Sequence, residues 1–262
     1  MKYRFAAILI SILIIFIHSN SASATDDLQT LDHLSDEALQ LVKAERYDDA
    51  ISLLHTFDRK LSQFVAEKIL INMDELRIIH VSLEEVLKAL EYEANKEDVI
   101  RRMTKFRLVV DAISSNYQPL WTEMEGTVMS AFQGLKNAVD HGNQEEYPEQ
   151  LHSFLSVYDL IYPSLLLDVS PEAIQKIEAR VQYIQQNKDI LLTTEESKVE
   201  LAALGDDLQS VFDQIYEDEA DPSIWWVIIS TGGIIISTLS YVGWKKYKAD
   251  REKTKSKKGF YN

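Results

Sequence analysis

Side chains suited to acid–base, nucleophilic or metal chemistry are scattered in this chain of 262 residues. It contains no cysteine, which excludes disulfides, thiolate metal sites and cysteine nucleophiles. No two of its six histidines are four residues apart, the spacing that places two metal ligands on one face of a helix. It also lacks a G-x-S-x-G nucleophile elbow and a glycine-rich phosphate loop. The sequence therefore predicts no catalytic residue, no cofactor and no metal centre.

Carboxylates are abundant, and one local cluster of them invites a metal interpretation. The formal net charge is −15 at pH 7, which argues against nucleic acid as a partner because phosphates would be repelled. The densest acidic run extends from Glu217 to Asp221. Its oxygens suit Ca²⁺ or Mg²⁺, but the run lacks the spaced ligand pattern of a calcium-binding loop. We interpret it as a solvated spacer, with divalent-cation binding as the alternative.

Three aromatic residues are the candidate contacts to a protein partner. Trp121 follows closely after a proline, and Tyr158 and Tyr162 are one helical turn apart. Aromatic side chains contribute strongly to binding when they lie in a partner interface. Burial in a helical core is the alternative interpretation for all three. The expected partner is an unidentified protein, with a second copy of this chain as one candidate.

The elements that must position these residues are helices. Between residues 25 and 220 apolar residues recur with helical spacing, and only 8 glycines and 5 prolines in the whole chain disfavour a turn-rich β fold. The pattern predicts an all-α domain of about eight antiparallel helices, either an irregular bundle or a short solenoid of hairpins. Helix boundaries are expected at Ser114-Ser115-Asn116 before Pro119, at Gly142, at Pro163, at Ser170-Pro171 and at the capping box Thr193-x-x-Glu196.

Residues 1–24 are typical of a secretory signal peptide. Lys2 and Arg4 precede an apolar run from Phe5 to Ile17, and Ser21-Ala22-Ser23-Ala24 supplies small residues for cleavage before Thr25. This apolar run is short for a membrane span, which needs about 20 residues. Removal of residues 1–24 is therefore expected, with an uncleaved anchor as the alternative.

A second apolar segment, residues 224–244, is long enough to cross a bilayer. It has 21 residues and no charge, with Trp225 and Trp226 at its start and Trp244 at its end, as in the aromatic belts of transmembrane helices. Its small residues share one face, which favours helix–helix association: Ser230, Gly233, Ser237 and Ser240.

Charge on either side of this segment predicts the topology. The tail 245–262 holds eight Lys or Arg and two acidic residues, whereas the body is strongly acidic. Because positive charge stays on the cytoplasmic side, we predict a single-pass protein of the cell membrane. Its domain 25–220 is extracytoplasmic, 224–244 is the transmembrane helix, and the basic tail is cytoplasmic, where it contacts anionic lipid.

Several motifs together resemble one known family. The YpjB family of sporulation proteins, found in endospore-forming relatives of Bacillus, is similar to this chain in three runs: Gln118-Pro119-Leu120-Trp121, Ile161-Tyr162-Pro163-Ser164-Leu165, and Trp225-Trp226 through Gly232-Gly233 to Tyr241-Val242-Gly243-Trp244-Lys245. The likeness covers most of the chain, including both hydrophobic ends. It implies a membrane-associated protein linked to spore formation, and it implies no catalytic residue, cofactor or substrate.

Three hypotheses about function follow. The first is a non-catalytic, membrane-anchored helical interaction module on the extracytoplasmic side that acts in sporulation. The second is a sensor or ligand-binding domain that signals through a partner, because the tail has no output domain of its own. The third is an envelope enzyme, which requires a cleft holding two or more titratable groups within hydrogen-bond reach.

Overall fold

The computed structural model describes residues 22–67, 71–92, 95–115, 118–187 and 190–218, together with short helical pieces between residues 228 and 247. The chain divides into two compact units, Met1–Asp213 and Gln214–Asn262. The described part of 22–218 contains eight α-helices, one 3₁₀ helix and no strand. The prediction of an all-α domain of about eight helices is therefore confirmed. Most of the predicted signal peptide, residues 1–21, lies outside the described residues.

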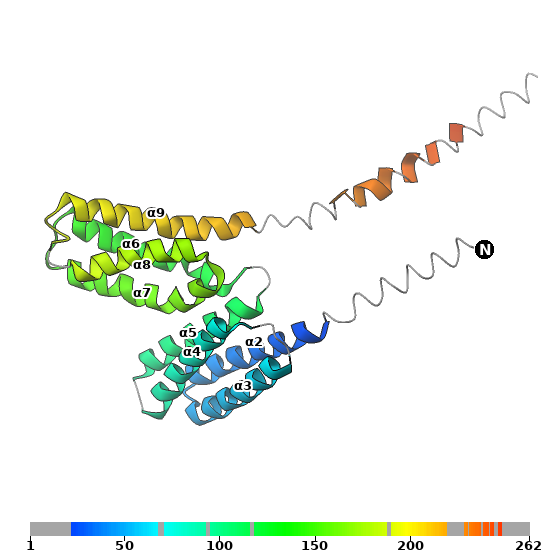
Figure 1. Ribbon diagram of the computed structural model, residues 1–262, viewed down its shortest axis with the longest axis horizontal. Coiled ribbons are helices and arrows are strands. Elements are labelled where there is room, and N and C mark those ends of the chain that lie inside the picture. The colour runs from blue at the N-terminus through cyan, green and yellow to red at the C-terminus, as the bar shows by residue number, and fades with distance from the viewer. Residues whose placement is uncertain are drawn as a thin grey trace, which may run out of the picture. The chain divides into compact units, whose positions relative to one another are not determined.

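The first four helices form one bundle (Figure 1). They are α2 (Ala22–Lys43), α3 (Tyr47–Glu67), α4 (Met73–Glu91) and α5 (Lys96–Ser114). Helix α2 packs against both α3 and α5, and α4 packs against α5 and α3, so the helices close around a shared centre. Apolar side chains from all four helices meet there in one cluster, in which the ring of Phe57 lies edge-on to that of Phe106 at 5.0 Å between centroids.

The next helices form a second bundle after the 3₁₀ helix η1 (Leu120–Met124). They are α6 (Glu125–Asp140), α7 (Tyr147–Asp168), α8 (Pro171–Gln186) and α9 (Glu195–Asp218). Helix α6 packs against α7, and α7 contacts α8. Ion pairs of Arg180 with Glu200 and Asp207 join α8 to α9. Helix α9 in turn approaches α6, where a Cβ at Gly205 would lie 2.6 Å from the Phe132 ring. Four helices thus close a second ring.

These contacts decide between the two predicted arrangements. In a solenoid of hairpins each repeat contacts only its neighbours. Here α2 returns to α5 and α6 returns to α9, so each set of four helices closes on itself. The bundle interpretation is supported, in the form of two consecutive bundles within the unit Met1–Asp213. They meet where α5 packs against α7 and where η1 contacts both of these helices.

Helix ends follow local sequence signals in most places. Asn72 forms a capping box with Glu75 at the start of α4, and the Asn95 side chain caps α5. Ser170 caps α8 ahead of a proline at its first position, as predicted. Between the second bundle's first two helices, Gly142 adopts a φ of 62°, a conformation that glycine takes without strain.

Two predicted boundaries are wrong. Helix α7 does not stop at Pro163 but runs through it to Asp168. A proline inside a helix costs about 3 kcal/mol, yet Ile161 and Leu165 on either side are almost fully buried, and their packing keeps the helix continuous. At α9 the capping residue is Thr194, not Thr193, because its hydroxyl accepts the backbone N–H of Ser197. The capping signal was one residue out of register.

Candidate functional site

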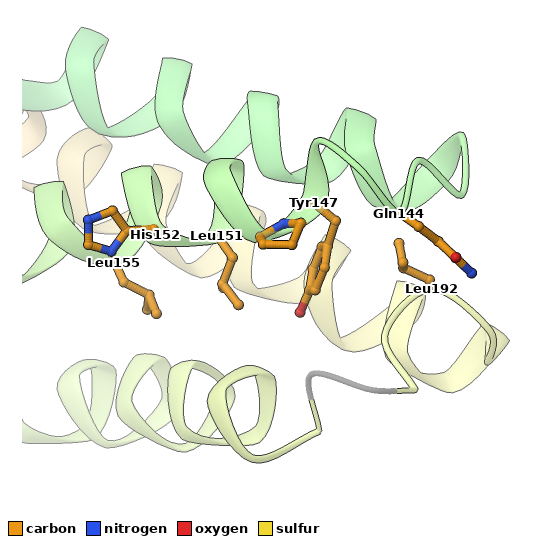
Figure 2. Close-up of a pocket in the computed structure, with 7 residues that line it drawn as sticks. Gln144, Tyr147, Leu151, His152, Leu155 and Leu192 are labelled. Carbon is orange, nitrogen blue, oxygen red and sulfur yellow. The ribbon is translucent and has the colours of Figure 1, made fainter.

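An open apolar groove runs along the first half of α7 in the second bundle (Figure 2). Its volume is about 450 Å³. Tyr147, Leu151 and Leu155 follow one another at four-residue spacing on α7 and project to the same side of it, while Leu192 enters from the turn before α9. The side chains of Tyr147 and Leu151 are buried and form the floor, whereas those of Leu155 and Leu192 are half-buried walls.

Polar side chains surround this apolar floor. Gln144 and His152 line the groove and are exposed, and Glu145, Glu146 and Glu149 are exposed residues of the same helix start. An apolar floor with a polar, acidic surround is suited to receive apolar side chains of a peptide or helix. The hydrogen bond from Tyr162 to Glu178, which ties α7 to α8, lies further along α7 than the groove.

A partly buried charge network joins α2 and α5 within the first bundle, next to the segment that leads to the second bundle. The Arg107 guanidinium on α5 donates to the Asp32 carboxylate on α2 through two nitrogens, at 2.7 and 3.3 Å. It also contacts Asp111 at 3.5 Å and lies 3.7 Å from Asp36. Ser114 donates to Asp32 as well. One cation thus serves three carboxylates, and the Arg107 side chain is only 10% exposed.

The segment that connects the bundles is held from both sides. The backbone N–H of Leu120 donates to Asp111 of α5 at 2.6 Å, and the next residue, Trp121, donates its indole N–H to Asp168 of α7 at 2.6 Å. Desolvation raises the pKa of the Asp168 carboxyl to about 6, against the opposing effect of the indole N–H, and the charge of Asp111 adds to the rise. Desolvation also raises the pKa of Asp111, although Leu120 and Arg107 oppose it.

A smaller charged cleft of about 170 Å³ lies where α5 of the first bundle packs against α7 of the second. Asp159 of α7 lies 3.4 Å from the Arg101 guanidinium and 3.3 Å from the Lys105 ammonium of α5. Lys105 also contacts Glu85 of α4 at 3.3 Å. Arg102, which lines the cleft too, donates to Asp98. Because the cations of this cleft already have carboxylate partners, its charges tie helices together rather than form a free anion site.

The structure places the three predicted aromatic contacts mainly in the core. Trp121 has no exposed surface and packs 5.5 Å from the Phe212 ring, and Tyr158 is 7% exposed. Tyr162 is half-buried, and burial together with the bond to Glu178 raises its pKa to about 12. The three residues therefore do not form the exposed patch that a partner contact through them would need. Trp121 instead fixes the connecting segment in place, through its hydrogen bond to Asp168 and its contact with Phe212.

Residues of the predicted membrane segment are described only in part. Helical pieces occur at 228–229, 231–236, 238–240 and 242–243, while Ser230 and Ser237 of the small-residue face lie outside the described residues. Gly233 and Ser240, the other two members, are exposed. The large aliphatic side chains of these pieces are exposed as well: Ile228, Ile229, Ile234, Ile235, Ile236, Leu239 and Val242. Among the residues that the structure describes, no helix has the length and apolar character needed to span a bilayer.

The predicted acidic spacer also falls at the limit of the described chain. Glu217 and Asp218 end helix α9, and 219–221 lie outside the described residues. Among the residues with described positions, no group of three or more His, Cys, Asp or Glu side chains is arranged to hold a metal ion. Cation binding by the run from Glu217 to Asp221 thus stays a prediction.

Sequence reasoning missed the junction residues. Arg107 and Asp111 have the i, i+4 spacing of an ordinary surface ion pair, and nothing local distinguishes them. Asp168 lies 47 residues from Trp121, so their pairing depends on tertiary structure alone. The groove could not be predicted from the sequence either, because its floor residues have the same helical spacing as core residues.

Comparison with known proteins identifies the family. The chain matches the family described as "Sporulation protein YpjB (SpoYpjB)" over residues 28–256. It is 35% identical over 264 residues to a Bacillus subtilis (strain 168) protein described as "Uncharacterized protein YpjB", and the alignment covers 98% of each chain. No solved structure matches the chain significantly. With most of its length matched by the family and by this relative, the chain belongs to the YpjB family of sporulation proteins.

Proposed function

We propose that this protein is a non-catalytic, membrane-anchored helical interaction module that acts in sporulation with its two bundles on the extracytoplasmic side. Membership of a sporulation family supports the process. The groove on the second bundle supports the interaction part, because it is a mainly apolar hollow of about 450 Å³ whose half-buried walls, Leu155 and Leu192, border open space. Open apolar surface rimmed by polar residues is a mark of interaction sites.

The anchor rests on the C-terminal segment. Its described isoleucines are all more than half exposed, and aliphatic surface of this extent is costly in water but favourable in a bilayer. The eight basic residues that follow 244 and the acidic body before 224 fit the positive-inside rule. The tail is then placed to contact anionic lipid, at about 1 kcal/mol for each basic residue near the surface.

The groove can be tested by site-specific photo-crosslinking in sporulating cells. A photoreactive amino acid at His152, on the groove rim, is expected to give a discrete crosslinked species. The matched control places the same group at Gln182, an exposed residue of α8 that does not line the groove. Leu155→Glu, which puts a charge in the groove wall, should abolish the product while the protein remains folded. Equal products from both positions, or a product insensitive to Leu155→Glu, would contradict the interaction role.

A second candidate function is a sensor that binds a small ligand and signals through a partner. The groove volume of about 450 Å³ lies within the range of small-molecule sites, and Gln144 and His152 offer polar contacts at its rim. A small apolar ligand would fill the groove, and photo-crosslinking from His152 would then give no larger species containing a second protein. Ligand-detected mass spectrometry on protein purified from sporulating cells separates the two candidates, since only the sensor retains a stoichiometric small molecule.

A further inference from the structure

The apolar residues of the groove on α7 have the spacing of a helix-packing surface. Tyr147, Leu151 and Leu155 follow one another every four residues and form an apolar row along the helix (Figure 2). At a rise of about 1.5 Å per residue this row is about 12 Å long, or two helical turns. Leu192, on the turn before α9, stands opposite the row. Between such rows a partner helix can lay the side chains of its own apolar face.

The groove offers few partners for the backbone of a bound segment. Apart from the Tyr147 hydroxyl, the polar side chains of its lining are those of Gln144 and His152. The described part of the domain contains no strand to which an extended peptide could add. An extended segment would therefore leave backbone groups without hydrogen bonds where it covers the apolar row. A helix forms its backbone hydrogen bonds internally, so the groove favours a helical occupant.

The bundle that carries the groove is the more acidic of the two. Residues 118–218 contain 19 acidic and 5 basic side chains, a formal net charge of −14, whereas residues 22–115 contain 19 and 12, which gives −7. Three described cations of the second bundle pair with carboxylates of that bundle: Lys136 with Asp140, Arg180 with Glu200 and Asp207, and Lys198 with Glu195. Carboxylates therefore remain in large excess on this bundle.

Part of this excess lies beside the groove. Glu149 lies one helical turn before His152 on α7, and Glu145 directly follows Gln144, so both glutamates adjoin residues that line the groove. Both are exposed, and no described Lys or Arg forms an ion pair with either of them. Their place at the start of α7 stabilises that helix. A cation from a partner can still pair with them, because no existing ion pair has to break.

We propose that the groove receives a cationic amphipathic helix of a different protein. The apolar face of that helix packs against Leu151 and Leu155, and its Lys or Arg side chains pair with Glu145 and Glu149. A second copy of this chain is not the occupant, because its equally acidic bundle would be repelled and its basic tail lies across the membrane in the proposed topology. The inference rests on the proposed function, since it names the class of partner for the same groove.

Two designed peptides test the charge preference. Both are helical and about 14 residues long, with Leu at the same positions along one face, and their other residues are mainly Lys in one peptide and mainly Glu in the other. Their dissociation constants for the full-length protein in phosphatidylcholine nanodiscs are measured by fluorescence anisotropy, with empty nanodiscs as the blank. We expect the Lys peptide to bind about tenfold more tightly, and this preference to shrink as salt is raised, because exposed charges are screened.

Two double variants identify the carboxylates involved. Glu145→Gln with Glu149→Gln removes two charges beside the groove, and Glu172→Gln with Asp206→Asn removes two exposed charges from α8 and α9. The first pair should slow association of the Lys peptide about fivefold, because charges at the rim of an interface act mainly on the association rate. The second pair should change that rate less than about twofold. Leu155→Gln should instead speed dissociation of the Lys peptide, because it weakens the apolar contact.

The outcomes separate this inference from the proposed function. Equal binding of the two peptides, or tighter binding of the Glu peptide, would overturn the charge preference; if Leu155→Gln weakens that binding, the groove remains the interaction site. Binding of the Lys peptide that is insensitive to Leu155→Gln, or equal effects of the two double variants, would show attraction to the acidic surface at large and overturn the inference. Binding of neither peptide would overturn the helical partner, while the crosslinked product from His152 decides the proposed function independently.

The partner's own sequence provides a second measurement. Mass spectrometry of the species crosslinked from His152 in sporulating cells identifies which residues of the partner lie in the groove. We expect a segment whose apolar residues are three and four apart and in which Lys and Arg outnumber Asp and Glu. An acidic segment, or one interrupted by prolines, would contradict the inference.

Discussion

The two bundles differ in how completely they enclose their apolar residues. In α2–α5 the buried side chains of all four helices form one cluster, with Phe57 and Phe106 at its centre. In α6–α9 the close approach at Gly205 seals one side, whereas the first half of α7 leaves a groove above Tyr147 and Leu151. The four helices of the first bundle therefore share one apolar core. The second bundle has a groove that can receive a partner. Four substitutions test this difference between the bundles.

The largest expected effect is on the core of the first bundle. Phe57 is 1% exposed and its ring meets Phe106, so Phe57→Ala removes a large buried side chain from a closed cluster. We expect the free energy of unfolding to fall by about 3–5 kcal/mol. Urea unfolding followed by circular dichroism measures this. A loss below about 1 kcal/mol would show that the first bundle is not tightly packed around Phe57.

Removal of the central cation should be the next most costly change. Arg107→Met keeps the length of the side chain but leaves Asp32 and Asp111 without their guanidinium at a mostly buried position. Breaking a buried pair from one side costs about 3 kcal/mol, since the remaining charges stay desolvated. Thermal unfolding is the measurement, with Arg77→Met on the exposed face of α4 as the control. If both variants lower the unfolding temperature equally, the charge network around Arg107 does not stabilise the fold more than an exposed ion pair does.

A smaller effect is expected at the sealed side of the second bundle. In Gly205→Ala the new Cβ would lie 2.6 and 2.9 Å from two atoms of the Phe132 ring, and that ring is buried and has little room to move. Overpacking of this kind costs about 1–3 kcal/mol. The matched control is Gly126→Ala on α6, where no atom lies within 4 Å and alanine should stabilise the helix by up to about 1 kcal/mol. Chemical denaturation of both variants should give opposite signs; the same sign for both would contradict the close approach of α9 to α6.

The smallest effect on stability is expected at the groove itself. Leu155 is half-buried because it borders open space, so Leu155→Gln should change the free energy of unfolding by less than about 1 kcal/mol. The same change should weaken crosslinking from His152. A large loss of stability would mean that Leu155 belongs to a closed core, and the contrast between the bundles would disappear.

Much of the fold could be predicted because its signals are local. Helical spacing of apolar residues gave the helices, and Ser170-Pro171 gave the start of α8 to the residue. The end of α7 was missed because proline normally ends a helix, and only the burial of Ile161 and Leu165 overrides that preference. At the start of α9 the predicted cap, Thr193, was one residue early, because the side chain that accepts a helix N–H is that of Thr194.

The candidate sites could not be predicted, because they depend on contacts between distant residues. The residues next to Trp121 in the sequence do not determine whether its side chain is buried or exposed. Its placement is decided by Asp168 and Phe212, which lie 47 and more residues further along the chain. The groove likewise arises from the course of α7 relative to the turn that carries Leu192, and no local pattern encodes that separation.

Membrane anchoring with both bundles outside the cytoplasm can be tested by cysteine labelling of the full chain. Single cysteines at Ala202, an exposed residue of α9, and at Ser256, in the basic tail, are treated with a membrane-impermeant maleimide in intact protoplasts. We expect membrane-bound protein that is labelled at position 202 at once and at position 256 only after lysis. Labelling at 256 with protection at 202, or recovery of the protein in the soluble fraction, would contradict it.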